Sequence, residues 1–413
     1  MDLNFFYMYK VAGELLPAYP IYVLFFQYKG LSLASISWLL IIWSIPGLIL
    51  EIPSSILADR WNRRYLLITG RVFRGLCFVI WSLSGNFFGF AMGFLLWGIG
   101  GTLSSGTEEA WLYDCLETKS REGEFDRIWG KCVFYSQLSV GIAGVIGSFI
   151  AVYSMTLTMW ISVCVIAVST IFAIILKEYN NTERHRSDPV MQPVPRQEGF
   201  SKYRVYFVEA FSTFQDGMKF CFTYKFIPVM IGFFVTVLVT AGVLDEYDQL
   251  IIRSMGLPLG LVGLWSFLRY GMEALGGYVA WRLKKIFLFF GISNPFSMQL
   301  WLAVIAGILL LFTAGFPIIF LLPLYGSYYF LMSCARVLFT DSLQKNIGDQ
   351  GRATVQSLAM MLEAPGGILI CAIFGIAGES DHLHKAMAVI AIWILVLCPL
   401  FWMIHKKRYV EIG

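Results

Sequence analysis

The sequence places several carboxylates inside long apolar segments, where an ionised side chain is costly. Glu14 lies near the middle of segment 4–27, close to Tyr19 and to prolines that can open a helix toward a cavity. A charge at the centre of a membrane span costs at least about 2.5–3.5 kcal/mol unless it is paired or faces water. Glu14 is therefore a candidate proton or cation site, and an ion pair with Lys10, four residues earlier, is the alternative.

A second candidate, Glu363, directly precedes the run Ala-Pro-Gly-Gly, which breaks a helix and frees backbone groups. Such a break is tolerated at membrane depth where it lines a cavity. Two interpretations of Glu363 are therefore given equal weight: a residue of the functional site, and a structural residue held in an ion pair. Gln137, a polar residue in an otherwise apolar segment, completes the predicted substrate or proton site together with Tyr19.

Three acids, Asp245, Glu246 and Asp248, lie within four positions toward the end of another apolar segment. They point in different directions on a helix, so they cannot all line one cavity. An extracellular gate or a solvated rim is the favoured interpretation of the group. Within it, Asp245 and Glu246 are the better candidates for binding substrate or a proton.

The composition identifies the class of protein that must position these residues. Of the 413 residues, 58% are hydrophobic and only 14% are charged, and the mean hydropathy is +0.69. Soluble domains contain about 25% charged residues, so a water-facing surface could not be covered. The long unbroken apolar runs exclude an outer-membrane barrel, whose strands alternate. The fold class predicted is an all-α polytopic membrane protein.

Twelve membrane-spanning helices are expected, since a span needs about 20 apolar residues and its loops are short. They are predicted near residues 4–27, 34–56, 65–84, 87–113, 129–152, 155–176, 227–251, 259–281, 297–314, 316–340, 353–377 and 384–404. Basic residues gather in alternate loops, which predicts that both termini face the cytoplasm. The protein is accordingly placed in the cytoplasmic (inner) membrane. Because its basic residues serve this orientation, nucleic acid is not expected as a partner.

The chain is predicted to consist of two similar halves. Residues 1–176 and 223–413 each hold six spans, and the polar, proline-containing stretch 177–222 is interpreted as a cytoplasmic linker. Short matching stretches, such as those around Asp114 and Asp341, occur in the same order in both halves. Two parallel repeats of six spans are one layout of membrane transporters.

The loop Ser-Ile-Leu-Ala-Asp-Arg-Trp-Asn-Arg-Arg, residues 55–64, resembles the G-x-L-A-D-R-x-G-R-R/K loop of the major facilitator superfamily. The resemblance implies a cytoplasmic latch between two six-helix bundles that releases as they rock. Asn62 replaces the second glycine of the pattern, and asparagine tolerates a left-handed turn. The predicted gate and latch residues are Asp59, Arg60, Arg63, Arg64, Glu109, Asp114, Arg336 and Asp341.

The stretch Glu-Ala-Trp-Leu-Tyr-Asp, residues 109–114, resembles an EAxLYD-type signature of one branch of that superfamily, which mixes drug and metabolite exporters. Two departures put antiport of the common drug-exporter type in doubt. The arginine usual in the fourth span is missing from residues 94–98, and the glycine motif of the fifth span is partial. None of these motifs specifies a substrate.

The sequence therefore predicts a secondary transporter working by alternating access. Its expected activity is proton-coupled export of a small cationic or amphipathic compound or metabolite. An importer or facilitator of a metabolite or inorganic ion is the alternative, and a membrane enzyme or sensor is a remote one, since no catalytic cluster or soluble signalling domain is found. We expect no enzymatic activity, no cofactor, no metal site and a monomer whose partners are a small molecule, protons and the bilayer.

Overall fold

The computed structural model describes residues 2–60, 62–179, 226–345, 352–377 and 383–410. Within these ranges the regular structure is helical, and no strand is found. The chain divides into two compact units, and each is described by itself. The predicted linker 177–222 lies outside the described residues from position 180 on.

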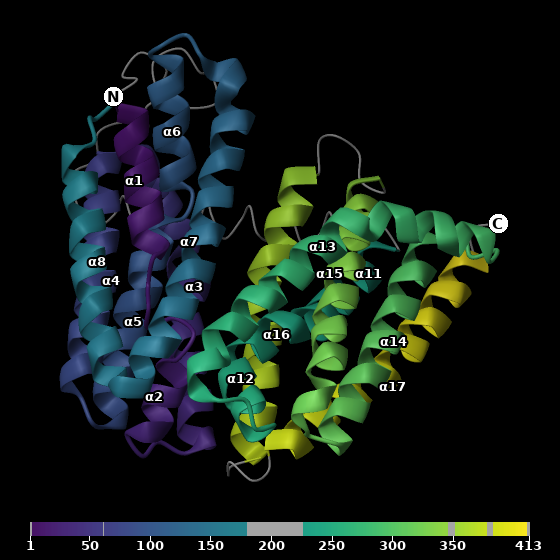
Figure 1. Cartoon of the computed structure of the whole chain (residues 1–413). Coiled ribbons are helices and arrows are strands. Elements are labelled where there is room, and N and C mark those ends of the chain that lie inside the picture. The colour runs from purple at the N-terminus through teal and green to yellow at the C-terminus, as the bar shows by residue number, and fades with distance from the viewer. Residues whose placement is uncertain (1, 61, 180–225, 346–351, 378–382, 411–413) are drawn as a thin grey trace. The chain divides into compact units, whose positions relative to one another are not determined.

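The first unit holds residues 2–19, 45–147 and 154–179 of the described chain. Its elements are α1 (Asp2–Glu14), the later part of α3 (Leu33–Arg60), α4 (Arg63–Leu83), α5 (Phe87–Ser104), α6 (Thr107–Glu117), η1 (Glu122–Glu124), most of α7 (Phe125–Tyr153) and α8 (Met155–Ile175). In Figure 1 these helices stand side by side as one bundle. Helix α4 packs against both α5 and α8.

The second unit holds residues 20–44, 148–153 and the described residues from 226 on. Its elements are α2 (Tyr22–Tyr28), the start of α3, the end of α7, α11 (Ile227–Phe233), η2 (Phe234–Leu238), α12 (Val239–Ser254), η3 (Leu259–Leu261), α13 (Val262–Phe289), α14 (Pro295–Gly315), η4 (Ile319–Leu321), α15 (Leu322–Lys345), α16 (Arg352–Ala377) and α17 (Leu383–Val410). Helix α14 packs against α15 and α17, and α13 packs against α15.

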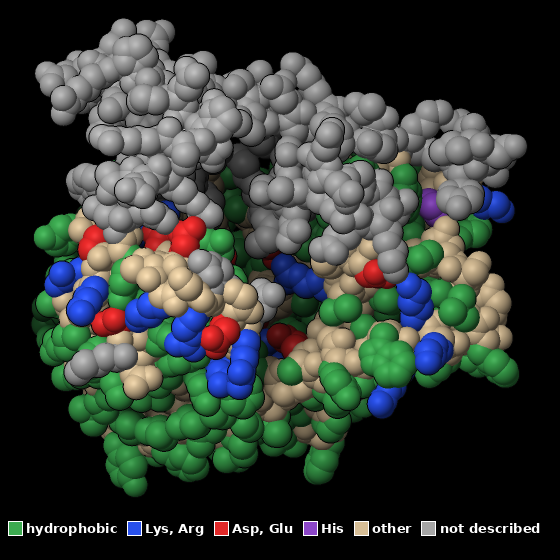
Figure 2. All heavy atoms as spheres, turned by 90° about the horizontal axis from the view of Figure 1, so that it is seen from above, with side chains coloured by type: hydrophobic (Ala, Val, Ile, Leu, Met, Phe, Trp, Pro, Cys, Tyr) green, Lys and Arg blue, Asp and Glu red, His purple; other side chains and the backbone are tan. Residues whose placement is uncertain are grey.

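Eight helical segments of the described chain are long and apolar enough to cross a membrane. The joined pair α1 and α2, together with α13, α15 and α16, are the other span-length segments. This pattern confirms the predicted all-helical polytopic fold. Figure 2 shows charged side chains gathered on the face it views, with hydrophobic side chains covering the flanks below.

Three predicted spans are not regular helices. The first is interrupted after Glu14, where residues 15–21 form turns before α2 begins, in agreement with the expected effect of its prolines. The fourth breaks at Ser105 and Gly106, whose φ is +68°. The seventh contains the π-helical turn η2. Breaks at membrane depth occur where neighbouring groups or a cavity satisfy the freed backbone.

Close backbone contacts fix two of these regions in the first unit. A Cβ atom at Gly70 would lie 2.9 Å from the Gly100 carbonyl oxygen, and one at Gly100 would lie 2.6 Å from that of Gly70. A Cβ atom at Gly147 would lie 2.7 Å from the Pro17 carbonyl carbon. Small residues thus let α4 meet α5, and let α7 meet the break after α1.

Candidate functional site

A cavity of about 310 Å³ lies inside the first unit. Three cationic and three acidic side chains line it, together with two tryptophans. They are Lys10, Arg71, Arg74, Glu14, Glu108, Glu109, Trp97 and Trp129. The rest of its lining is glycine and serine from α4, from the end of α5 and from the break between α5 and α6.

The cavity is deep within the helices. Arg74 lies eleven positions after the start of α4 at Arg63, which corresponds to about 16 Å along the helix axis. Its guanidinium binds both carboxylate oxygens of Glu14, at 3.0 and 3.4 Å, and lies 5.2 Å from the ring centroid of Trp97. Glu14 is the last residue of α1, so its charge lies at a helix end that the helix dipole disfavours. The arginine compensates for that position.

Glu108 organises the other side of the cavity. Its carboxylate accepts hydrogen bonds from Tyr9 at 2.9 Å, Lys10 at 2.5 Å and Arg71 at 3.1 Å. Arg71 is 2% exposed and also lies 3.7 Å from Glu14. The ion pair between Lys10 and Glu14 that the sequence offered as an alternative is therefore not formed. Lys10 instead pairs with Glu108, 98 positions away.

The break between α5 and α6 places the cavity's remaining acid. Glu108 and Glu109 lie in the first turn of α6, where the helix dipole favours negative charge. Glu109 is exposed, and the described residues give its carboxylate no hydrogen bond or ion pair. The sequence assigned Glu109 to the latch, whereas the structure places it on the cavity wall.

Of the other two predicted site residues in the first unit, one lies next to the cavity and the other lies outside it. Tyr19 stacks at a tilt on Trp97, with 5.9 Å between ring centroids, so it supports the cavity wall. Gln137 is exposed on α7 and is not part of the cavity lining. Its proposed role stays a prediction.

In the second unit, Arg269 of α13 binds three carboxylates. It donates to Asp245 and, at 2.5 Å, to Glu273, and its Nε lies 3.3 Å from Asp248. Arg269 and Glu273, four positions apart on α13, therefore form an intrahelical pair. Glu246 points elsewhere and accepts a hydrogen bond from Tyr22 of α2.

Glu363 is bound by Arg336 at 2.7 Å. From the sequence, Glu363 was predicted for the substrate site and Arg336 for the latch. The structure brings the two together between α16 and α15. Arg336 is 46% exposed and Glu363 28% exposed in their side chains. This pair is therefore more accessible than that of Glu14.

Several residues predicted for the latch form contacts within the first unit. Arg63 donates to Asp114 and, at 3.0 Å, to the carbonyl oxygen of Ala110, and Arg64 donates to the carbonyl oxygen of Ile174. The side chains of Asp59 and Arg60 lie outside the described residues. The second unit has a corresponding contact, Lys284 to Asp341 at 3.2 Å.

One expectation about this loop is wrong. Asn62 is not left-handed but extended, with φ −60° and ψ 110°, and its side chain accepts from the amide of Tyr65 as the N-cap of α4. Glu178 accepts from the amides of Arg63 and Arg64, at 3.1 and 3.0 Å. Both contacts satisfy amide groups that a helix start leaves unpaired, so capping explains why asparagine fits there.

Arg71, Arg74 and Glu108 are not among the substrate-site or latch residues predicted from the sequence. The structure places them around the cavity, with Glu14. Their depth within the spans was the available signal, since an ionisable residue inside a membrane segment is a functional hypothesis by default.

Comparisons with known proteins agree with this architecture. The family model described as Major Facilitator Superfamily matches residues 4–370. The chain is 22% identical over 410 residues to an uncharacterised MFS-type transporter, YxaM, of Bacillus subtilis (strain 168), covering 94% of this chain and 92% of that protein.

Solved structures with the same fold include the nucleoside transporter NupG, with a TM-score of 0.76 and 13% identity, covering 98% of this chain and 100% of that one. A POT family transporter in complex with a thioalcohol-conjugated peptide has a TM-score of 0.68 and 12% identity, covering 98% and 96%. The family match, which spans most of the chain, identifies this protein as a membrane transporter that belongs to the Major Facilitator Superfamily.

Proposed function

We propose that this transporter moves a small metabolite carrying both a positive and a negative charge, together with a proton. The observation behind the proposal is the cavity in the first unit, where cationic and acidic side chains are present in equal number. Its volume of about 310 Å³ is at the lower end of the range usual for small-molecule sites. An amphipathic drug would find few apolar groups there besides the two tryptophans.

The substrate's negative group is assigned to Arg74. Its guanidinium now binds Glu14 through two hydrogen bonds, a geometry that a substrate carboxylate can reproduce. When the substrate takes this place, Glu14 loses both of its hydrogen bonds from Arg74, retains only the longer contact with Arg71 at 3.7 Å, and takes up a proton. Proton and substrate therefore favour each other's binding and travel in the same direction.

The substrate's positive group is assigned to Glu109, whose carboxylate stands on the cavity wall. This assignment retains part of the sequence-based expectation, in which a cationic compound is exported. Export of a cation that binds at Glu109 alone is thus the second candidate function. With an inwardly directed proton gradient the two differ: cotransport with a proton gives uptake, and exchange for a proton gives export.

The expectations about subfamily, membrane, orientation and oligomeric state are also part of this proposal. They comprise the EAxLYD-type branch, the cytoplasmic membrane, the cytoplasmic position of both termini, and the monomer. The predicted halves, 1–176 and 223–413, belong to the same proposal and are supported by the corresponding pairs of Asp114 and Asp341 with basic side chains.

Transport into proteoliposomes tests the function. The purified full-length protein is reconstituted with a pH-sensitive dye inside, and amino-acid-like zwitterions are compared with their amides and esters, which lack the negative charge. We expect flux only for the zwitterions, with acidification of the lumen as they enter. Flux of the amides with alkalinisation of the lumen would instead establish cation export.

The variant Glu14→Gln separates binding from coupling, because the amide resembles the protonated acid. It should bind the zwitterion with an affinity that no longer depends on pH and should move it without a proton. Glu124→Gln is the matched control, since Glu124 pairs with Arg121 on the surface outside the cavity. Proton movement that persists in Glu14→Gln at the level of the control would rule out the assigned role of Glu14.

A further inference from the structure

The second unit surrounds Arg269 with more carboxylates than one guanidinium can neutralise. Asp245, Asp248 and Glu273 all lie against it, and Arg269 is 1% exposed. If all three acids were ionised, the cluster would have a net charge of −2 inside a membrane helix bundle. A buried carboxylate without a counter-charge neutralises itself by binding a proton.

The contacts identify which of the three acids is left over. Arg269 donates through its two terminal nitrogens to Asp245 and Glu273, and these two side chains are 28% and 33% exposed. Asp248 is 3% exposed and faces only Nε, at 3.3 Å. That nitrogen has no hydrogen-bond partner in the described part of the chain, so Asp248 forms an ion pair with the guanidinium but no hydrogen bond to it.

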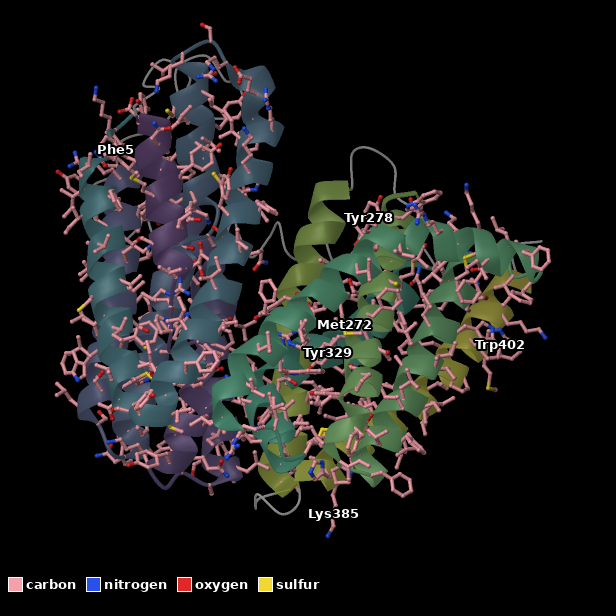
Figure 3. The ribbon with its side chains drawn as sticks, in the orientation of Figure 1. Phe5, Met272, Tyr278, Tyr329, Lys385 and Trp402 are labelled. Carbon is pink, nitrogen blue, oxygen red and sulfur yellow. The ribbon has the colours of Figure 1, made fainter. Side chains whose placement is uncertain are left out.

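Tryptophan and tyrosine side chains surround the carboxyl of Asp248. Trp265 of α13 donates to Oδ2 at 2.7 Å. Oδ1 is buried, and the described residues form no hydrogen bond with it. The group of α15 that faces the carboxyl is the Tyr325 hydroxyl, which lies 3.0 Å from that of Tyr329; Figure 3 marks Tyr329 among the helices of this unit.

The remaining charged groups nearby are already engaged. Glu246, on the same helix, binds Tyr22, and Glu363 of α16 binds Arg336 of α15. Lys284, farther along α13, binds Asp341. No described cation besides Arg269 contacts Asp248. Arg336 is near enough to act on the charge of Glu273, but it is hydrogen-bonded to Glu363.

We propose that Asp248 holds a proton on Oδ1 and is a proton-binding site of the second unit, separate from Glu14. A protonated Oδ1 donates to the Tyr325 hydroxyl, which in turn donates to Tyr329. Loss of the proton would place a third negative charge against the single guanidinium of Arg269, among α12, α13 and α15. Proton release therefore requires water to reach Asp248, and so a rearrangement of these helices. The inference goes beyond the proposed function, because it requires no substrate.

Infrared difference spectroscopy of the purified full-length protein tests the site, with the proton and deuteron as probes. At neutral pH we expect a carbonyl band of a protonated carboxyl that shifts on transfer to D2O. Asp248→Asn, which preserves shape and the acceptor for Trp265, should reduce this band by one carboxyl group per chain. Asp341→Asn is the matched control, since Asp341 pairs with Lys284 at a more exposed position, and should leave the band unchanged.

Two outcomes overturn the assignment: a wild-type protein without the band, or an Asp248→Asn protein that retains it in full. Tyr325→Phe is a second variant in case Asp248→Asn does not fold. It keeps the acid but removes its acceptor, so the band should move in frequency, and an unmoved band would also overturn the proposal. Substrate takes no part in these measurements, so their failure is distinct from a failure of the transport assay.

Discussion

Replacing Glu108 by glutamine should destabilise the protein strongly, although the substitution only replaces one carboxylate oxygen by an amide nitrogen. The carboxylate accepts from Tyr9, Lys10 and Arg71, and glutamine has a single acceptor oxygen. In either orientation its amide group points at a cation. Removing one partner of a buried ion pair costs about 3–5 kcal/mol, and the 12% exposure of Glu108 places this site near about 3 kcal/mol.

Thermal unfolding of the purified protein measures this effect. A loss of about 3 kcal/mol corresponds to about 6–12 °C for a unit of roughly 200 residues. Glu109→Gln is the matched control, one position along the same helical turn but exposed, and surface changes of this kind stay within about 0.5 kcal/mol. Adding Lys10→Met to Glu108→Gln removes the stranded cation, so part of the loss should return.

Equal melting temperatures for Glu108→Gln and Glu109→Gln would refute this reasoning, because the two residues share a helical turn and differ in their burial and in their partners. A double variant less stable than Glu108→Gln would refute it as well. It would mean that Lys10 stabilises the unit mainly through another contact, such as its position 5.3 Å from the Trp129 ring.

Three further predictions concern stability. Gly147→Ala should lower the melting temperature by the equivalent of about 1–3 kcal/mol, because the added Cβ atom would meet backbone atoms, which cannot move aside. Gly130→Ala is the control in the same helix: its Cβ atom would enter open space, so the melting temperature should not fall. Arg269→Gln should cost about 3–5 kcal/mol and Arg336→Gln less than about 1 kcal/mol, since the first is buried and the second half-exposed; equal losses in chemical denaturation would contradict this. Asp2 accepts hydrogen bonds from a tyrosine and a lysine, which lower its pKa from 3.8 to about 2. Its stabilisation is therefore complete above pH 3.8 and disappears as the pH falls toward 2, and melting curves of Asp2→Asn should lack this acid-dependent loss.

The sequence predicted the fold class because its signals are local. The length of each apolar run and the basic residues between runs occur within a few dozen positions, and the matching stretches of the two halves are short enough to be recognised in the sequence alone. The depth of Glu14 also marked it as unusual. Its partner was not predictable, because Arg74 lies 60 positions away and the two come together only because α1 and α4 both pack against α8. From the sequence, the expected partner was Lys10, four positions before Glu14.

The helix break at Gly106 had no comparable signal. Glycine is common in membrane helices, so the run Ser-Ser-Gly-Thr was consistent with an unbroken span over 87–113. The break decides that Glu109 faces the cavity instead of the latch. Likewise, the three acids on α12 were correctly expected to point in different directions. Which of them would be paired was not predictable, because the buried Arg269 that binds Asp245 and Asp248 comes from α13.

The π-helical turn at Phe234–Leu238 affects how this protein is compared with its relatives. Such a turn holds about one residue more than an α-helical turn, so every residue after it is rotated by about 100° relative to a regular helix. Aligning this span without a gap to a relative whose helix is regular would pair Asp245 and Asp248 with positions on the wrong face. At 22% identity, an alignment of this span is therefore best anchored on Asp245, Asp248 and Arg269 together, and not on the length of the helix.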